Sequence, residues 1–260
     1  MTMSTSLARP VTRALVRRVG GRFLDATVQH QPAQAIDLRC AVQQHAAYVE
    51  ALRDSGLRVV ELGESDAHPD GCFVEDQAVV LGERALVTRS GCPARRGEAP
   101  SVEAALAAHV EVVRMKGPAT LDGGDVLRLG RHLFVGISGR TNRAGVDVLA
   151  SFASTFEVVP VPVGGLHLKC LASPVGPDRV LVATGLLDPG IFSGIADVLV
   201  VDDDDAYAAN CLALSDRVLV AAGYPRVVDT LTDAGLTVQV VETSEIAKAD
   251  GSLTCMSVLF

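Results

Sequence analysis

The hydrophobic positions of the chain fall into short apolar runs that recur in one order. An apolar strand, a charged turn, a second apolar strand, a helical pattern and a third strand follow one another. The unit begins at Gln77, Asp125, Leu168 and Asn210, so successive copies are offset by 48, 43 and 42 residues. Spacing this regular predicts a repeat of ββαβ modules in an α/β fold. Residues 101–113 supply the helical pattern of the first copy, and residues 186–195 take its place in the third.

A fifth module is complete only if the two ends of the chain meet. The last strand, residues 253–260, would pair near the first strand, residues 13–19, which a helix over residues 36–56 and a strand over residues 57–62 then follow. Closure of the ring removes exposed sheet edges and turns loops of all modules toward one axis. The sequence therefore predicts a single domain, residues 1–260, folded as a five-bladed α/β propeller. An open α/β sheet with helices on its faces is the alternative.

Composition and charge narrow the class of protein. With 48% hydrophobic and 21% charged residues among 260, the chain can build a large core. No apolar run approaches the roughly 18 residues of a bilayer span. The 23 Lys and Arg residues against 31 Asp and Glu residues leave a net charge of −8, which disfavours nucleic acid. Residues 1–10 lack the apolar segment of a secretory signal, so we expect a cytoplasmic protein without nucleic-acid or membrane partners.

The six cysteines form no CxxC or CxxxC pair, which argues against a zinc knuckle or a redox motif. In a cytosolic protein they should be reduced thiols, and one of them can serve as a nucleophile. Cys255 is favoured by its position, because the openings of the strands in a ring face the axis. His167, between two leucines of an apolar run, opens toward the same axis, although a lone histidine there can also be a satisfied core residue.

Two acidic segments interrupt the apolar pattern. PDGCFVEDQAVV carries Asp70, Glu75 and Asp76 with almost no basic residue beside them, which favours a bound cation. An acidic turn before a hairpin would have the same sequence pattern and is the alternative. Adjacent acids on a strand point to opposite faces unless the backbone turns there. In ATLDGGDVL, Asp122 and Asp125 flank two glycines that let the backbone approach whatever lies opposite, or that simply open a hairpin.

Arg95 and Arg140 follow the second strands of the first two modules. Their loops would face the same rim as the acids, where guanidinium groups can bind a ligand carboxylate. Solvated surface arginines are the alternative for each of them.

Five strings, FVEDQAVV, TLDGGDVL, FVGISGRTNRAG, GLHLKC and DGSLTCMSVL, together resemble the dimethylarginine dimethylaminohydrolases of the guanidine-modifying (pentein) superfamily. The resemblance runs from about Asp70 to the carboxyl terminus. It implies a five-bladed propeller around a central active-site channel. It also implies hydrolysis of asymmetric dimethylarginine or monomethylarginine to citrulline and dimethylamine or methylamine, without metal or cofactor. A methylated arginine would be the small-molecule partner of a monomer or homodimer.

The resemblance also implies roles for individual residues. Cys255 matches the nucleophile, His167 the general acid and base, and Asp122 the acid that pairs with this histidine. The remaining matches concern the substrate: Glu75 and Asp76 for its guanidinium, Asp70 for its α-amine, Arg95 and Arg140 for its α-carboxylate, and Leu24 as a weak counterpart of an early loop residue near the amine.

Four other interpretations remain open at this point. Arginine deiminases and amidinotransferases of the same superfamily share the cysteine, histidine and acid set, but they are longer chains with insertions. Agmatine deiminases would have no use for Arg95 and Arg140, because agmatine lacks an α-carboxylate. A ring-shaped binding module without catalysis would have no reason to hold Cys255, His167 and Asp122 as a set.

Overall fold

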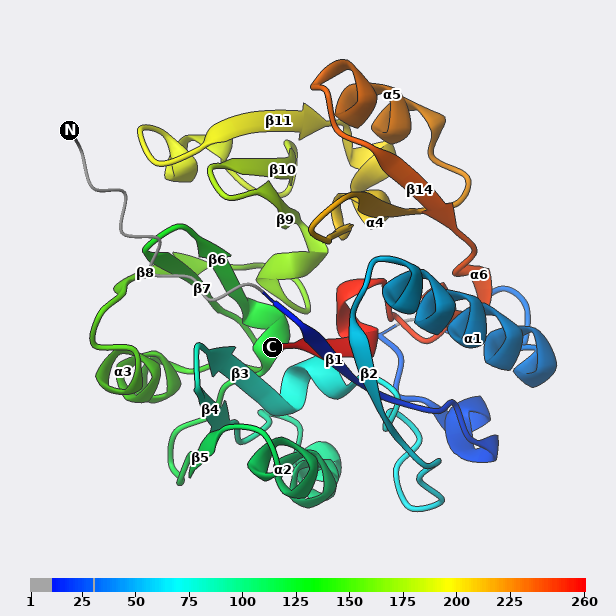
Figure 1. The fold of residues 1–260 in the computed structure, drawn as a ribbon, viewed down its shortest axis with the longest axis vertical. Helices are drawn as coiled ribbons and strands as arrows, with labels where there is room; N and C mark the ends of the chain where they lie inside the picture. The colour runs from blue at the N-terminus through cyan, green and yellow to red at the C-terminus, as the bar shows by residue number, and fades with distance from the viewer. Residues whose placement is uncertain (1–10, 30) are drawn as a thin grey trace.

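Five small sheets surround a common centre in the computed structural model, which describes residues 11–29 and 31–260. Figure 1 shows the helices α1, α2, α3 and α5 at the periphery and the C-terminal strand near the middle. The five-bladed propeller predicted from the repeat is confirmed. Residues 1–10, considered above for an export signal, lie outside the described residues. None of the described helices has the length and apolar character that a membrane span requires.

Each blade contains three strands, and the middle strand pairs antiparallel with the first and parallel with the third. The strands of the first four blades are β3 (Ala78–Leu81), β4 (Arg84–Val87) and β5 (Glu111–Arg114); β6 (Val126–Leu129), β7 (His132–Ile137) and β8 (Glu157–Pro162); β9 (Ala172–Gly176), β10 (Arg179–Ala183) and β11 (Asp197–Val201); and β12 (Leu212–Ala213), β13 (Val218–Ala221) and β14 (Val238–Val241).

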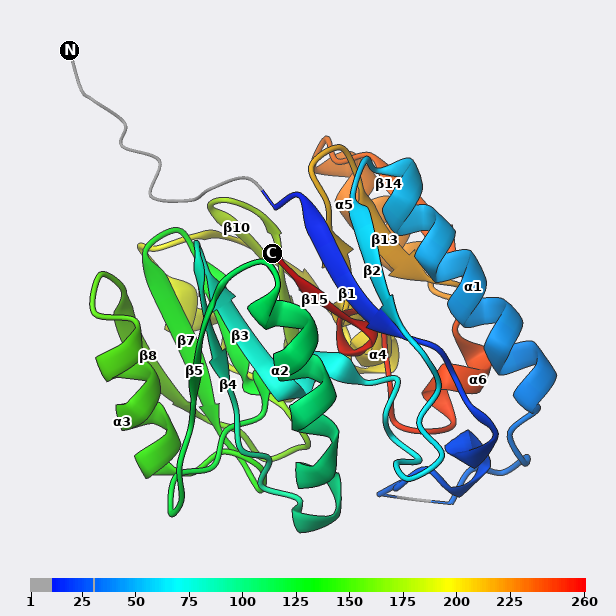
Figure 2. The same cartoon turned by 60° about the horizontal axis from the view of Figure 1, so that its bottom comes forward.

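The fifth blade joins the two ends of the chain, as the sequence predicts. β15 (Ser257–Leu259) pairs antiparallel with β1 (Arg13–Arg17), and β1 pairs parallel with β2 (Arg58–Leu62). In Figure 2, β1 lies between the other two strands. The segment just before β15, which contains Cys255, is therefore held at the centre of the ring.

The helices connect the second and third strands of the blades. They are α2 (Ala99–Ala107), α3 (Arg143–Phe152), α5 (Pro225–Asp233) and, in the closing blade, α1 (Leu38–Asp54), with the short helices α4 (Ala206–Ala209) and α6 (Ser244–Ala247) elsewhere. In α1 the side chain of Asp37 caps the first turn by accepting from Cys40 N, and Gly56, with a φ of 82°, follows the last turn. Between them Tyr48 is buried, and its hydroxyl bonds Ser257 Oγ at 2.7 Å, which ties α1 to β15.

Two expected helices differ from the structure. In the third blade the segment over residues 186–195 forms only the 3-10 turn Pro189–Phe192, because Gly190 and Gly194 favour other conformations and Gly194 has a φ of 75°. In the first blade the helix ends at Ala107, and the residues expected to extend it become β5. The β-branched pair Val112 and Val113 suits the sheet, where β5 lies parallel to β4.

The hydrophobic cores lie between neighbouring blades. In one of them Val79 and Leu86 of the first blade pack with Leu133 and Val135 of the second. Each blade therefore buries its faces only in the assembled ring. A short helical turn precedes the first strand of every blade, and these turns meet at the centre: Val74–Gln77, Gly123–Asp125, Leu168–Cys170, Ala206–Ala209 and Thr254–Met256.

Candidate active site

The central turns enclose a small cavity on one side of the ring. Its free space is about 30 Å³. The residues that line it are Thr27, Asp70, Phe73, Asp76, Arg95, Arg140, Leu166, His167, Ala249, Asp250, Gly251 and Cys255. Six of the residues singled out from the sequence are thus brought together from segments far apart in the chain.

Cys255 and His167 lie on two different central turns. Cys255 is on the 3-10 turn that leads into β15, and His167 stands immediately before the turn Leu168–Cys170, not inside a strand as the apolar pattern suggested. Both side chains are buried. Nε2 of His167 lies 3.2 Å from Oδ2 of Asp122 and 3.7 Å from Oδ1 of Asp76. The thiol of Cys255, the imidazole of His167 and the carboxylate of Asp76 therefore share one cavity. The carboxylate of Asp122, which does not line the cavity, also contacts the imidazole.

The two glycines between Asp122 and Asp125 are needed for close packing. A Cβ atom at Gly124 would lie 2.7 Å from Nδ1 of His167 and 2.9 Å from Oδ1 of Asp76. The backbone N–H of Gly124 instead donates to that carboxylate at 3.0 Å. A Cβ atom at Gly123 would lie 2.0 Å from the carbonyl oxygen of Glu75. Any side chain here would separate the histidine from its carboxylate neighbours.

Asp125 holds the histidine segment in place. Its Oδ1 accepts from Leu168 N at 2.9 Å and its Oδ2 accepts from Ser138 Oγ at 2.6 Å. Burial raises the pKa of Asp125, whereas nearby His167 opposes that rise. The acid therefore acts on the backbone beside the histidine, while Asp122 contacts the ring itself.

Arg95 is bound almost entirely by the protein. Its Nη1 donates to Asp76 Oδ2 at 2.5 Å, and its Nε and Nη2 form a two-point pair with Glu98 at 3.0 and 2.8 Å. Nη2 also donates to the carbonyl oxygen of Phe73 at 2.9 Å. In this structure Arg95 therefore fixes the position of Asp76. Glu98, which no sequence motif indicated, completes this buried pair.

Arg140 is the more available guanidinium. Its Nη1 is buried and has no hydrogen-bond partner among the residues that the structure describes, and it lies 3.8 Å from Oδ2 of Asp122. An unpaired buried donor is costly, so this group favours an incoming acceptor such as a carboxylate.

Backbone groups of an early loop close one side of the cavity. Thr27 N donates to Asp70 Oδ1 at 3.0 Å, and Gln29 N donates to the carboxylate of Asp250. Leu24, the weak counterpart suggested by the resemblance, is 54% exposed and does not line this cavity. Main-chain donors carry no signal in a single sequence, so nothing in the sequence indicates Thr27 and Gln29.

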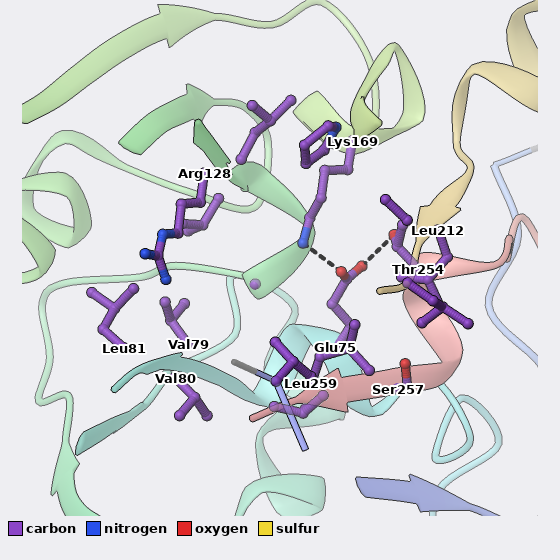
Figure 3. A pocket seen from close by; sticks show the side chains of 18 of the residues that line it. Glu75, Val79, Val80, Leu81, Arg128, Lys169, Leu212, Thr254, Ser257 and Leu259 are labelled. Atoms are coloured by element: carbon purple, nitrogen blue, oxygen red, sulfur yellow. Dashed lines mark hydrogen bonds and ion pairs between the residues drawn. The ribbon is translucent and has the colours of Figure 1, made fainter. Parts of the chain in front are cut away.

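Glu75 faces a different space from Asp76. The backbone turns at Val74–Gln77, so the two adjacent acids point to different cavities. Glu75 lines a second cavity of about 530 Å³, where its carboxylate binds Lys169 and Thr254 (Figure 3). Glu75 is not among the residues that line the catalytic cavity, and its contact with a substrate guanidinium, expected from the resemblance, stays a prediction.

The charges in the catalytic cavity are strongly coupled. Burial would lower the pKa of His167, but Asp76 and then Asp122 outweigh it and raise that pKa well above its usual range. Burial would raise the pKa of Asp76, yet His167 and Arg95 bring it down to about 2. The pKa of the Cys255 thiol is raised by burial and further by Glu75 and Asp76. The resting site therefore holds an imidazolium, carboxylates and a neutral thiol.

A cation-binding geometry is present at the same place. Ligand atoms of Asp76, Asp122 and His167 all lie within 4.8 Å of one another. Both carboxylates already have cationic neighbours, since Arg95 binds Asp76 and Arg140 lies 3.8 Å from Asp122.

Comparisons with known proteins concern most of the chain. The family described as "N,N dimethylarginine dimethylhydrolase, eukaryotic" matches residues 25–190. A protein of Streptomyces coelicolor named N(G),N(G)-dimethylarginine dimethylaminohydrolase is 37% identical over 254 residues, which are 96% of this chain and 97% of that protein. A protein of the same name from Pseudomonas aeruginosa is 32% identical over 230 residues, or 86% of this chain and 90% of that protein.

Solved structures are similar over nearly the whole fold. The Pseudomonas aeruginosa enzyme, as a cysteine-to-serine mutant complexed with citrulline, has a TM-score of 0.92 at 28% identity and covers 97% of this chain and 100% of that chain. A dimethylarginine dimethylaminohydrolase adduct with S-methyl-L-thiocitrulline has a TM-score of 0.90 at 29% identity, covering 96% and 100%. The N-terminal domain of a cyanobacterial arginine dihydrolase shares the fold, with a TM-score of 0.87 at 20% identity, covering 95% and 97%.

Proposed function

The chain belongs to the dimethylarginine dimethylaminohydrolase family, and we propose that it hydrolyses Nω,Nω-dimethyl-L-arginine and Nω-monomethyl-L-arginine to L-citrulline and dimethylamine or methylamine. The observation that carries this proposal is the shared cavity of Cys255, His167 and Asp76. A guanidinium is a poor electrophile because resonance spreads its charge, so it needs a soft nucleophile and an acid that holds it in position. The cavity supplies both.

We propose that the substrate is held at three points. Asp76 binds the guanidinium, Asp70 binds the α-amine and Arg140 binds the α-carboxylate, for which its unpaired Nη1 is available. Arg95, which was expected to bind the carboxylate together with Arg140, lines the same cavity. Because its guanidinium donates to Asp76, we propose that its main role is to hold Asp76 in position. The guanidinium is thereby fixed in the cavity that contains Cys255.

Substrate binding would prepare the nucleophile. Burial and neighbouring acids raise the pKa of Cys255, so the residue is a neutral thiol before substrate binds. A bound guanidinium cation brings a positive charge close to the sulfur. This charge lowers the pKa of the thiol and so lowers the cost of forming the thiolate. The same cation occupies the place where the attack occurs.

The chemistry then proceeds in two halves. The thiol of Cys255 first loses its proton to solvent, because His167 is already protonated. The thiolate then attacks the central guanidinium carbon, and the tetrahedral adduct collapses when imidazolium His167 gives its proton to the departing amine. This leaves a covalent amidino-Cys255 intermediate and a neutral imidazole. His167 then takes a proton from water, the water oxygen attacks the amidino carbon, and the carbon–sulfur bond breaks to release citrulline. Asp122 orients the ring and stabilises its charged form throughout.

We propose that the whole chain acts as one catalytic domain, as expected from the sequence. The cavity takes residues from four of the five blades, and the fourth adds the support described below. A thiol nucleophile also suits a reducing compartment such as the cytoplasm, whereas a monomer and a homodimer both remain compatible with this site.

The test is an incubation with asymmetric dimethylarginine followed by assays of citrulline and amine. Equal amounts of citrulline and dimethylamine are expected. Release of ammonia from unmodified arginine, with no dimethylamine from dimethylarginine, would instead indicate a deiminase. No turnover of any arginine derivative, with the protein folded, would favour a non-catalytic module.

A further inference from the structure

Hydrogen bonds of side chains and one backbone carbonyl join four residues in a closed circuit beside the catalytic cavity. Lys169 Nζ and Thr254 Oγ1 donate to the two carboxylate oxygens of Glu75, the second at 2.7 Å, and Figure 3 shows both bonds among the residues that line the larger cavity. Asn210 Nδ2 donates to Thr254 Oγ1 at 3.1 Å and to the carbonyl oxygen of Lys169 at 2.9 Å, which closes the circuit. We call Glu75, Lys169, Asn210 and Thr254 the bracing ring.

Asn210 is the most constrained member of the bracing ring. Its Nδ2 makes two donations, and its Oδ1 accepts from Thr254 N at 3.0 Å. The residue is only 2% exposed. A buried amide whose donors and acceptor are all used has one favourable orientation, and moving either partner leaves a buried polar group unsatisfied. Asn210 thus locks the backbone at Thr254 to the backbone at Lys169.

The bracing ring joins the three segments that carry Asp76, His167 and Cys255. Three of its members are close in the chain to proposed active-site residues: Glu75 is next to Asp76, Thr254 is next to Cys255, and Lys169 is two residues after His167.

The repeat itself places Asn210 at an active-site position. Asp76 and Cys255 each stand two residues before the first strand of their blades, β3 and β15, and Asn210 stands two residues before β12. The fourth blade contributes no residue to the catalytic cavity, among those that the structure describes. It contributes at this position an amide that binds the neighbouring segments.

From this arrangement we propose that the bracing ring, with Asn210 as its central member, positions Cys255 against His167 and Asp76 for the reaction. The inference rests on the proposed function, and it assigns positioning residues rather than groups that touch the substrate. Nucleophilic attack needs the reacting atoms within a narrow range of distance and angle, so small displacements reduce the chemical step strongly. Of the three proposed substrate contacts, those of Asp70 and Arg140 involve residues that form no hydrogen bond with the bracing ring, so substrate affinity should change less than the chemical step.

Two positions of the ring allow a sharp test. Thr254→Val keeps the shape of the side chain and removes both bonds of the hydroxyl, whereas Thr254→Ser keeps the hydroxyl. Asn210→Asp replaces the donating Nδ2 by an oxygen. We expect Thr254→Val and Asn210→Asp to lower kcat by about 10-fold to 100-fold with KM changed by less than about threefold, and Thr254→Ser to recover most of kcat.

Gln44→Leu is the matched control. Gln44 is also a buried amide, which donates to Ser244 Oγ and accepts from Glu245 N, but it braces α1 against α6 and does not line the catalytic cavity. Its loss should lower the melting temperature as much as the ring variants do while leaving kcat close to that of the wild type.

The outcomes separate the two proposals. If Thr254→Val and Asn210→Asp keep wild-type kcat, or if Gln44→Leu loses as much kcat as they do, the positioning role is overturned while the hydrolase assignment stands. If the wild type forms no citrulline, the hydrolase assignment fails and the positioning role fails with it. Should Asn210→Asp not fold, the Thr254→Val and Thr254→Ser pair decides the matter, since both keep a side chain of nearly the original size.

Discussion

Nε2 of His167 lies 3.2 Å from Oδ2 of Asp122, a carboxylate with no exposed surface. A buried acid in this position does two things to an imidazole: it fixes the orientation of the ring, and it stabilises the protonated form. Asp76 adds to the second effect more strongly, since it is the largest of the influences that raise the pKa of His167. The imidazolium needed to protonate a departing amine is therefore present before substrate binds.

Asp122→Asn should shift the pH dependence of the reaction. Asp122 raises the pKa of His167, so its removal lowers that pKa and the imidazolium is lost at a lower pH. The alkaline limb of the kcat profile should therefore move to lower pH, and kcat near neutral pH should fall by about 10-fold to 100-fold. Steady-state assays between pH 5 and pH 10 measure this. An alkaline limb at the wild-type position would remove Asp122 from its pairing role.

Gly124→Ala should damage activity more than stability. The added methyl group would lie 2.7 Å from the ring of His167 and 2.9 Å from Asp76, so one of these side chains must move. We expect a destabilisation of about 1–3 kcal/mol, typical of overpacking, together with a large loss of kcat. Thermal melts and citrulline assays measure the two effects. Gly63→Ala, where nothing lies within 4 Å of the new atom, is the control and should change neither.

The ring of five blades could be predicted because its signal is periodic. Apolar runs in register at Gln77, Asp125, Leu168 and Asn210 gave the repeat, and the pairing of β15 with β1 follows from the need to close the ring. The prediction of a helix in the third blade was wrong because Gly190 and Gly194 disfavour a helix, although the spacing of the apolar residues there is typical of one.

The site could be predicted only in part, for reasons visible in Glu75 and Asp76. Nothing in two adjacent acids reveals the 3-10 turn that sends them to different cavities. The role of Asn210 was also beyond the sequence, because its partners Lys169 and Thr254 are 41 and 44 residues away and the bonds exist only in the closed ring. Residue types with a distinctive chemistry were found, and those that act by satisfying distant partners were not.

Cys255→Ser should abolish citrulline formation and leave the fold intact. A serine hydroxyl is a much weaker nucleophile than a thiolate. The substitution exchanges only the sulfur atom for a smaller oxygen atom, so the fold should be kept. Citrulline assay and circular dichroism measure both parts. Cys40→Ser, on the outer helix α1, is the matched control and should keep full activity. Citrulline production by Cys255→Ser at the wild-type rate would refute the assignment of the nucleophile.

His167→Gly should separate the two halves of the reaction. Without the imidazole, water is no longer activated, so an amidino adduct on Cys255 that does form should persist. Intact-protein mass spectrometry after incubation with a substrate carrying a good leaving group would then show an increase in mass. Normal turnover by this variant would exclude His167 from the mechanism.

Arg140→Ala should weaken binding of substrates that carry an α-carboxylate. Nη1 of Arg140 is buried and without a hydrogen-bond partner in the described part of the chain, so a substrate carboxylate would be its natural acceptor. A charged hydrogen bond contributes about 1.5–3 kcal/mol, so KM for dimethylarginine should rise by roughly 10-fold to 100-fold.

The decarboxylated substrate separates this effect from general damage to the site. Dimethylagmatine lacks the group that Arg140 would bind, so the wild type and Arg140→Ala should process it with similar kcat/KM. Arg143→Ala removes a nearby arginine whose exposed pair with Asp147 lies on the surface of α3, and it should leave both substrates unaffected. Equal losses for dimethylarginine and dimethylagmatine in Arg140→Ala would mean that Arg140 supports Asp122 and the histidine instead of the carboxylate, because the 3.8 Å approach to Asp122 is the other contact that the substitution removes.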